Sequence, residues 1–300
     1  MVINYKKKEF ILFIRLITII IIFNLNHVMC LNIKIEVIIT KRNILVYLLA
    51  TAALLQLSLW IYDINTDKAM TESESYYNEL SQLNEIMEID VPEKPEIDLP
   101  VIPEESTPTF PKDNFNYTQN PSSSFLKINA DYVGWIKIDN TKIDYPIVRG
   151  LDNEEYLDIN FKREPDVLGS IFMDYRNIGM GLDQHTILYG HYTERGYMFG
   201  DLNKYLNPNF LSENSTFTLS TPQGEKTYQI FSIHISPSEG PFLDTQFQTQ
   251  PYADFLNMLK EESITDLDVV LNENYDLLSL VTCDYAVEDG RLFIHAIEVK

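Results

Sequence analysis

Short apolar, β-prone runs alternate with polar turn sequences from residue 125 to the end of the chain. Runs of this kind, bounded by Gly, Pro, Asn and Asp, are typical of β-strands. The pattern predicts seven or eight strands, from runs at residues 133–138, 145–148, 170–173, 186–189, 216–219, 227–235, 277–282 and 292–299. Because helical stretches are few, the predicted fold class is mainly β, a closed or nearly closed and mostly antiparallel barrel.

Three stretches of this region have helical character instead. They lie at residues 153–157, 198–206 and 252–262. The third and longest is inserted before the strand 277–282, which ends next to a cysteine.

The last two predicted strands are joined by the turn residues Glu288-Asp289-Gly290. If these strands pair as a hairpin, Cys283 and Arg291 lie side by side at one rim of the sheet. A fixed cation beside a thiol favours the thiolate, which is the nucleophilic form. A lone cysteine is otherwise most often a buried core residue, and the neighbouring Arg291 favours the reactive alternative here.

His191 follows the predicted strand 186–189 and the glycine Gly190, so it also lies at a strand end. A Cys–His pair can perform acyl transfer, in which the thiolate attacks a carbonyl and the imidazolium protonates the leaving amine. Arg291 could hold the developing oxyanion.

The other histidines of the barrel are expected to be structural. His234 and His295 lie within predicted strands, and His185 is expected in the loop before one. No HExxH or CxxC spacing is present, so we expect no metal site.

The N-terminal part contains two apolar stretches. Residues 44–62 hold no charge, follow Lys41-Arg42 and are long enough to span a bilayer. The positive-inside rule then predicts an anchor with everything after residue 62 outside the cell. The earlier stretch, residues 10–23, is interrupted by Arg15 and is not expected to span; one hypothesis is that translation starts at Met29. Residues 1–43 are therefore treated as a cytoplasmic or misassigned lead.

Residues 63–124 differ from both neighbours in composition. They hold fourteen Asp or Glu against three Lys or Arg, and seven of the chain's fourteen prolines. We expect an acidic, proline-rich stalk with a possible helix at residues 71–89. The net charge of −21 argues against nucleic acid as a partner, because phosphate binding requires a basic surface. Residues 125–300 form the predicted catalytic domain.

These motifs together resemble the signature of the sortase family. His191 ends the string LYGH, Cys283 ends SLVTC, and Arg291 follows eight residues later. The strings GWIKIDNTKIDYPIV, NEEYL, GSIFMD and MFGDL are more narrowly similar to class B sortases. The resemblance covers residues 125–300 and departs at Ser279, where the family usually has Thr.

The resemblance implies roles for five residues. Cys283 is the expected nucleophile, His191 the general acid and base, and Arg291 the group that stabilises oxyanion and substrate. Asn153 matches a position proposed to assist, and Thr282 would shape the substrate groove.

The resemblance also implies a reaction and its partners. A membrane-anchored transpeptidase would cleave the C-terminal sorting motif of a surface protein through a thioacyl-enzyme and transfer the protein to a peptidoglycan amine, without cofactor or metal. Two alternatives stay open. One is an exported cysteine hydrolase that cleaves cell-wall peptides, and the other is an inactive, membrane-tethered barrel used for binding.

Overall fold

The computed structural model describes residues 41–89, 121–179, 181–237, 240–247, 250–283 and 290–299. The first apolar stretch, residues 10–23, and the proline-rich residues 91–120 lie outside this range. The chain divides into two compact units, Met1–Thr71 and Glu72–Lys300. The second unit contains the barrel and is described below.

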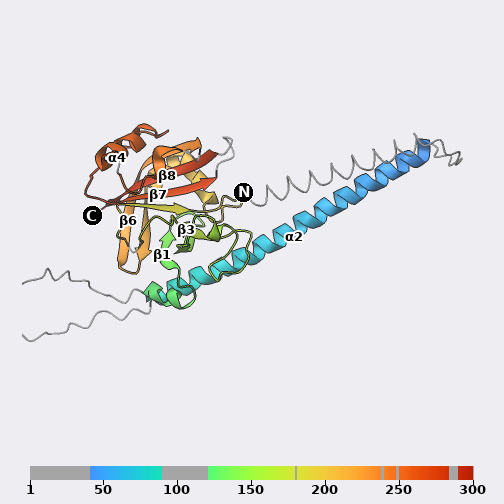
Figure 1. Ribbon diagram of the computed structural model, residues 1–300, viewed down its shortest axis with the longest axis horizontal. Helices are drawn as coiled ribbons and strands as arrows, with labels where there is room; N and C mark the ends of the chain where they lie inside the picture. Colours follow the sequence, from blue (N-terminus) through green and yellow to red (C-terminus); the bar gives the residue numbers. More distant parts are fainter. Residues whose placement is uncertain are drawn as a thin grey trace, which may run out of the picture. The chain divides into compact units, whose positions relative to one another are not determined.

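Eight strands form a closed barrel in the order β1-β2-β3-β4-β7-β8-β6-β5 (Figure 1). This confirms the predicted barrel of seven or eight strands. Within the described strands the pairs β2–β3 and β4–β7 are parallel and the other six are antiparallel. The strands are β1 (Tyr132–Lys137), β2 (Asp144–Val148), β3 (Ile171–Met173), β4 (His185–Tyr189), β5 (Thr216–Thr221), β6 (Gly224–Pro237), β7 (Leu277–Cys283) and β8 (Gly290–Val299).

Most helices of the barrel unit are short, and the longest helical segment in it is the end of α2. They are the end of α2 (Lys41–Ile89), η1 (Pro121–Lys127), η2 (Glu155–Leu157), η3 (Gly200–Leu206), α3 (Pro208–Glu213), η4 (Pro241–Leu243) and α4 (Tyr252–Glu261). The three helical stretches predicted within the barrel are present as η2, η3 and α4. Helix α3 was not predicted, although Asn207 supplies a cap by accepting a hydrogen bond from the Asn209 N–H at 2.9 Å.

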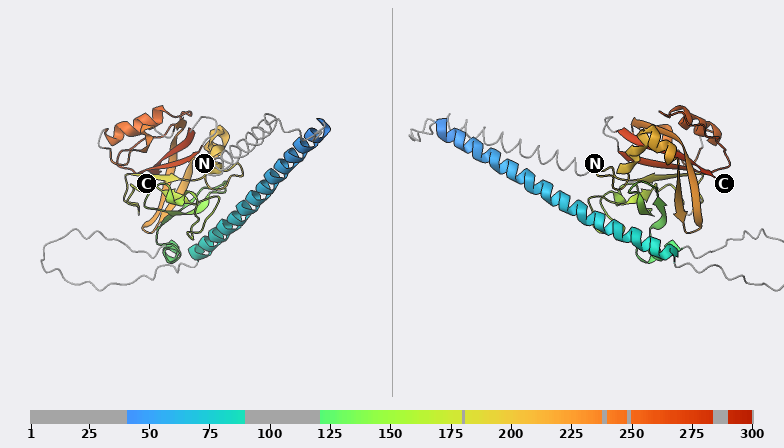
Figure 2. Two further views of the ribbon diagram at one scale, coloured as in Figure 1. Left: turned by 45° about the vertical axis from the view of Figure 1, so that its right-hand side comes forward. Right: turned by 180° about the vertical axis from the view of Figure 1, so that it is seen from behind.

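The strands β4, β7 and β8 are buried on both faces. On one face Leu188, Leu280 and Ile294 are paired neighbours with no exposed surface. On the other face Val281 and Phe293 belong to a cluster that includes the apolar side of α4. Figures 1 and 2 draw α4 over β7 and β8 in every view. Because α4 covers the outer face, the first row lies inside the barrel.

The end of α2 packs on the barrel. Tyr77 is buried and donates its hydroxyl hydrogen to the Gly169 carbonyl at 2.6 Å. Ser81 donates to the Asp144 carboxylate at 2.8 Å. Helix α2 includes the predicted helix at residues 71–89, and the compact unit that holds the barrel begins at Glu72. The reason is burial: Tyr77 packs against the barrel, whereas the sequence placed it in a stalk.

In the part of the chain that the structure describes, no helix is long and apolar enough to cross a membrane. The anchor at residues 44–62 stays a prediction.

Candidate active site

Cys283 is the last residue of β7, and its backbone is paired with Arg291 near the start of β8. The predicted hairpin, with these two positions side by side at one rim, is confirmed. Of Cys283 the structure describes the backbone. Arg291 is half-buried, and its Nη1 donates to the Gly290 carbonyl at 3.2 Å.

His191 reaches the same rim from the opposite side of β7. Strand β4 runs parallel to β7, with Tyr189 opposite Val281. The next amide, of Gly190, donates to the Val281 carbonyl at 3.2 Å. Continuing this register by two residues brings position 191 beside position 283. Three adjacent strands thus carry His191, Cys283 and Arg291 to one end of the sheet.

The chain at Gly190 has no room for a side chain. An added Cβ would lie 2.5 Å from Cγ of Phe199 and 2.6 Å from Cδ1 of Ile171. The His191 carbonyl in turn accepts a hydrogen bond from the Phe199 N–H at 3.0 Å. The backbone that presents His191 is therefore fixed by close packing on both sides.

Partial burial also sets the protonation of His191. Loss of water around the ring lowers the pKa of His191 below its ordinary value. At neutral pH the ring is accordingly uncharged, and it can accept a proton before it donates one.

Thr282 lies beneath the rim rather than on it. Its side chain is 2% exposed, and it alternates with Cys283 along β7, so it belongs to the interior row of Leu280. Its hydroxyl has no hydrogen-bond partner among the described residues. The expected role of Thr282 in shaping the substrate groove stays a prediction.

Asn153 is connected to the site through a buried carboxylate. Its amide donates to Asp174 at 3.0 Å and its carbonyl accepts from the Tyr175 N–H at 3.0 Å. Asp174 has no exposed surface and also accepts from Arg176 at 2.8 Å and from the Tyr189 hydroxyl at 2.9 Å. Tyr189 lies two residues before His191, so this network connects the Asn153 loop to the end of β4.

Burial and hydrogen bonding have opposite effects on Asp174. Burial alone would raise the pKa of its carboxyl, but the hydrogen bonds from Arg176, Asn153 and Tyr189 lower the pKa below its ordinary value. Asp174 is thus a carboxylate at neutral pH and keeps accepting these bonds.

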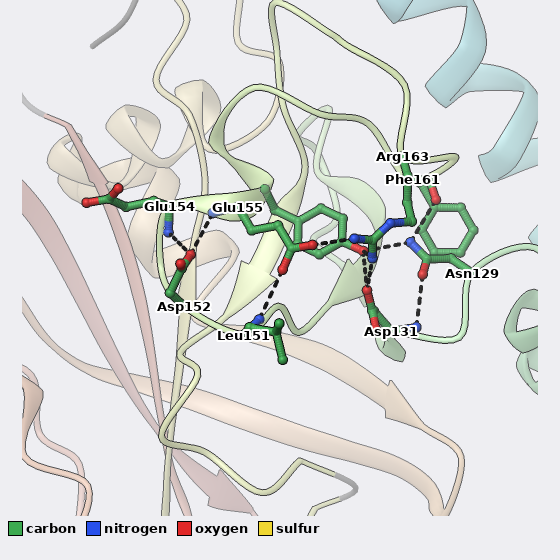
Figure 3. Close-up of polar contacts among 9 residues, drawn as sticks. Asn129, Asp131, Leu151, Asp152, Glu154, Glu155, Phe161 and Arg163 are labelled. Atoms are coloured by element: carbon green, nitrogen blue, oxygen red, sulfur yellow. Dashed lines mark hydrogen bonds and ion pairs between the residues drawn. The ribbon is translucent and has the colours of Figure 1, made fainter.

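The loop that carries Asn153 is held by a polar cluster shown in Figure 3. Asp152 accepts from the backbone N–H groups of Glu154 and Glu155, each at 2.9 Å. Glu155 forms an ion pair with Arg163, which also pairs with Asp131. The loop therefore has its own internal support.

Sequence reasoning missed the burial of two residues, Asp174 and His185. Asp174 lies after a strand like many solvated carboxylates, and no spacing marks it as buried. The predicted loop position of His185 was wrong: it begins β4 and has no exposed surface, because α4 and the segment before it cover that end of the strand. His234 and His295 are packed, as expected.

Comparison with known proteins agrees with this arrangement. Residues 136–299 match the family described as Sortase domain. Sortase B of Listeria monocytogenes is 38% identical over 171 residues, which cover 56% of this chain and 70% of that protein. Sortase B of Staphylococcus aureus is 35% identical over 167 residues, covering 55% and 68%.

Solved structures give the same result. A Staphylococcus aureus sortase B–substrate complex superposes with a TM-score of 0.64 at 28% identity, covering 77% of this chain and 97% of that one. Sortase B from Bacillus anthracis, in complex with AAEK1, gives a TM-score of 0.56 at 36% identity, covering 60% and 85%.

Proposed function

The chain belongs to the sortase family and to its class B, a group of cysteine transpeptidases, and we propose that it joins surface proteins to the cell wall from an anchored position outside the membrane. The substrate would be a protein with a C-terminal sorting motif, and the acceptor an amine of peptidoglycan. One observation carries the proposal: the registers of β4, β7 and β8 bring His191, Cys283 and Arg291 together at one rim.

The first half-reaction is acylation of Cys283. Its sulfur attacks the carbonyl carbon of the scissile peptide bond, and His191 takes the thiol proton. As the C–N bond breaks, the same proton passes from His191 to the leaving amine. Arg291 stabilises the oxyanion of the tetrahedral intermediate. The product is a thioester between Cys283 and the sorted protein.

The second half-reaction releases the protein. The incoming amine attacks the thioester carbonyl, His191 takes a proton from it, and the C–S bond breaks. His191 then returns the proton to the Cys283 sulfur. The lowered pKa of His191 supports this order, because a neutral ring can act first as a base.

The location is the second part of the proposal. Residues 44–62 are uncharged and follow Lys41-Arg42, and this pattern supports an anchor with its N-terminus in the cytoplasm. Both substrates of the reaction lie outside the membrane, where the barrel would then be. Labelling of a cysteine introduced at an exposed position such as Leu151 (90% exposed) by a membrane-impermeant reagent on intact cells tests it; labelling only after lysis contradicts it.

The reaction is tested with the full chain purified in mild detergent. It is incubated with a library of internally quenched sorting-motif peptides, with and without short peptidoglycan amines. We expect cleavage that disappears in Cys283→Ala and a mass increase equal to the transferred amine. Cleavage without transfer to any amine would instead indicate the cysteine hydrolase, and absence of both turnover and thioester would leave a binding module.

A further inference from the structure

One buried hydrogen-bond chain crosses the three strands that carry the site residues. The Oγ of Ser279 on β7 lies 2.7 Å from Nε2 of His185 on β4 and 2.6 Å from Nδ1 of His295 on β8. The Nδ1 of His185 lies 2.7 Å from the Asp244 carbonyl oxygen. None of the three side chains has exposed surface. Each of these strands therefore contributes one member to the chain.

The hydrogens of this chain have one consistent arrangement. The Asp244 carbonyl can only accept, so Nδ1 of His185 donates to it. Burial keeps His185 uncharged, so its Nε2 is an acceptor and takes the hydroxyl hydrogen of Ser279. The Ser279 oxygen then accepts from Nδ1 of His295. Ser279 donates to one histidine and accepts from the other, so removing its hydroxyl leaves two buried ring nitrogens without this partner.

Few residue pairs join β4 to its two neighbouring strands, β3 and β7. Strand β4 forms two pairs with β3, Phe172–Tyr189 and Met173–Leu188. It forms five with β7, and that pairing is parallel, which is slightly less stable per residue than antiparallel pairing. A shift of β4 along β7 would move position 191 away from position 283.

We propose that Ser279 is a positioning residue, which ties β4 and β8 to β7 through His185 and His295. In the sequence, His185, Ser279 and His295 lie six, four and four residues from His191, Cys283 and Arg291, and His191 follows the end of β4 by two residues. Because a β-strand is stiff over a few residues, the hydrogen-bond chain through Ser279 also fixes the strand ends that carry the three site residues. The inference rests on the proposed catalytic roles of those three residues.

The test compares Ser279→Ala with Ser232→Ala in the full chain. Ser232 is a matched control: it has no exposed surface, donates its hydroxyl hydrogen to the Leu259 carbonyl, and lies on β6, which carries none of the three site residues. With a peptide that the wild type cleaves, we expect kcat of Ser279→Ala to fall about tenfold or more with KM nearly unchanged. Ser232→Ala should lose a similar amount of thermal stability but keep its kcat. Ser279→Thr, which retains the hydroxyl, should restore most of the activity.

Three results would overturn the proposal. They are an unchanged kcat in Ser279→Ala, an equal loss in Ser232→Ala, and no recovery in Ser279→Thr. If Ser279→Ala does not fold, the pair His295→Asn and His295→Leu decides, because Asn keeps an N–H donor near the place of Nδ1. Greater activity in the Asn variant supports the chain, and equal loss in both contradicts it.

A second readout separates this inference from the proposed function. The rate at which iodoacetamide alkylates Cys283, followed by peptide mass spectrometry, needs no sorting motif. It depends on the groups beside the thiol. A change in that rate in Ser279→Ala but not in Ser232→Ala supports positioning even if no peptide is cleaved. Equal rates in both variants and the wild type contradict it.

Discussion

Mild acid should destabilise the barrel through three buried histidines: His185, His234 and His295. Burial lowers the pKa of each below the ordinary value, to about 4 for His185 and His234. Below a pH of about 6.5 the unfolded chain therefore binds more protons than the folded one. Their contribution to stability is fully present above that pH and is lost as the pH falls toward the folded values.

The size of the effect follows from these pKa values. Between pH 7 and about 5.5, one such histidine lowers the free energy of unfolding by about 1 kcal/mol, and the three together by about 3–4 kcal/mol. Native domains are stable by only about 5–15 kcal/mol, so this is a large fraction of the total. Ordinary carboxylates titrate near a pH of about 4 and contribute little in this interval.

The assay is urea unfolding of the full chain in detergent, followed by tryptophan fluorescence across this pH interval. His234→Leu is the informative variant, because it removes one titrating ring whose two nitrogens have no partner among the described residues. We expect the pH slope of the unfolding free energy to fall by about a quarter in this variant, since His191 also has a lowered pKa and one of four such histidines is gone. At pH 7 its stability should not decrease, because no hydrogen bond is lost.

The reasoning is refuted if the wild-type free energy of unfolding changes by less than about 1 kcal/mol over the interval. It is also refuted if His234→Leu keeps the full slope. Either result would mean that the rings are already charged, or solvated, in the folded protein.

Three further substitutions test the packing around the site. Gly190→Ala places a Cβ 2.5 Å from Cγ of Phe199 and should cost about 1–3 kcal/mol in thermal or urea unfolding, with a fall in kcat; an unchanged kcat would show that His191 does not depend on this contact. Asp174→Asn removes a buried charge from Arg176, which is 36% exposed and can recover some hydration, so we expect a loss of about 2 kcal/mol at neutral pH; equal stability of the variant and the wild type would contradict the network. Tyr77→Phe removes the buried hydroxyl that bonds the Gly169 carbonyl and Ser170 and should cost about 1 kcal/mol, whereas no change in the unfolding midpoint would argue against docking of the α2 end.

The sequence by itself determined the features that depend on near neighbours in the chain. Alternating apolar runs and turn residues located all eight strands, because strand formation follows the local pattern. The short connection after Cys283 implied a hairpin, and a hairpin places Arg291 beside it whatever the rest of the fold does. Gly190 and the preceding strand placed His191 at a strand end. The resemblance to the sortase signature depends on the same three residues, Cys283, Arg291 and His191.

Tertiary structure decided what depends on distant segments. The parallel pairing of β4 with β7 brings position 191 to position 283, and no local pattern specifies which strand pairs with which across such a separation. The end of α2, which the sequence analysis assigned to the stalk, packs on the barrel and belongs to the same compact unit. Burial of His185 under the segment around α4 turned an expected loop residue into part of the Ser279 chain. In each case the deciding energy comes from surfaces that meet only when the chain is folded.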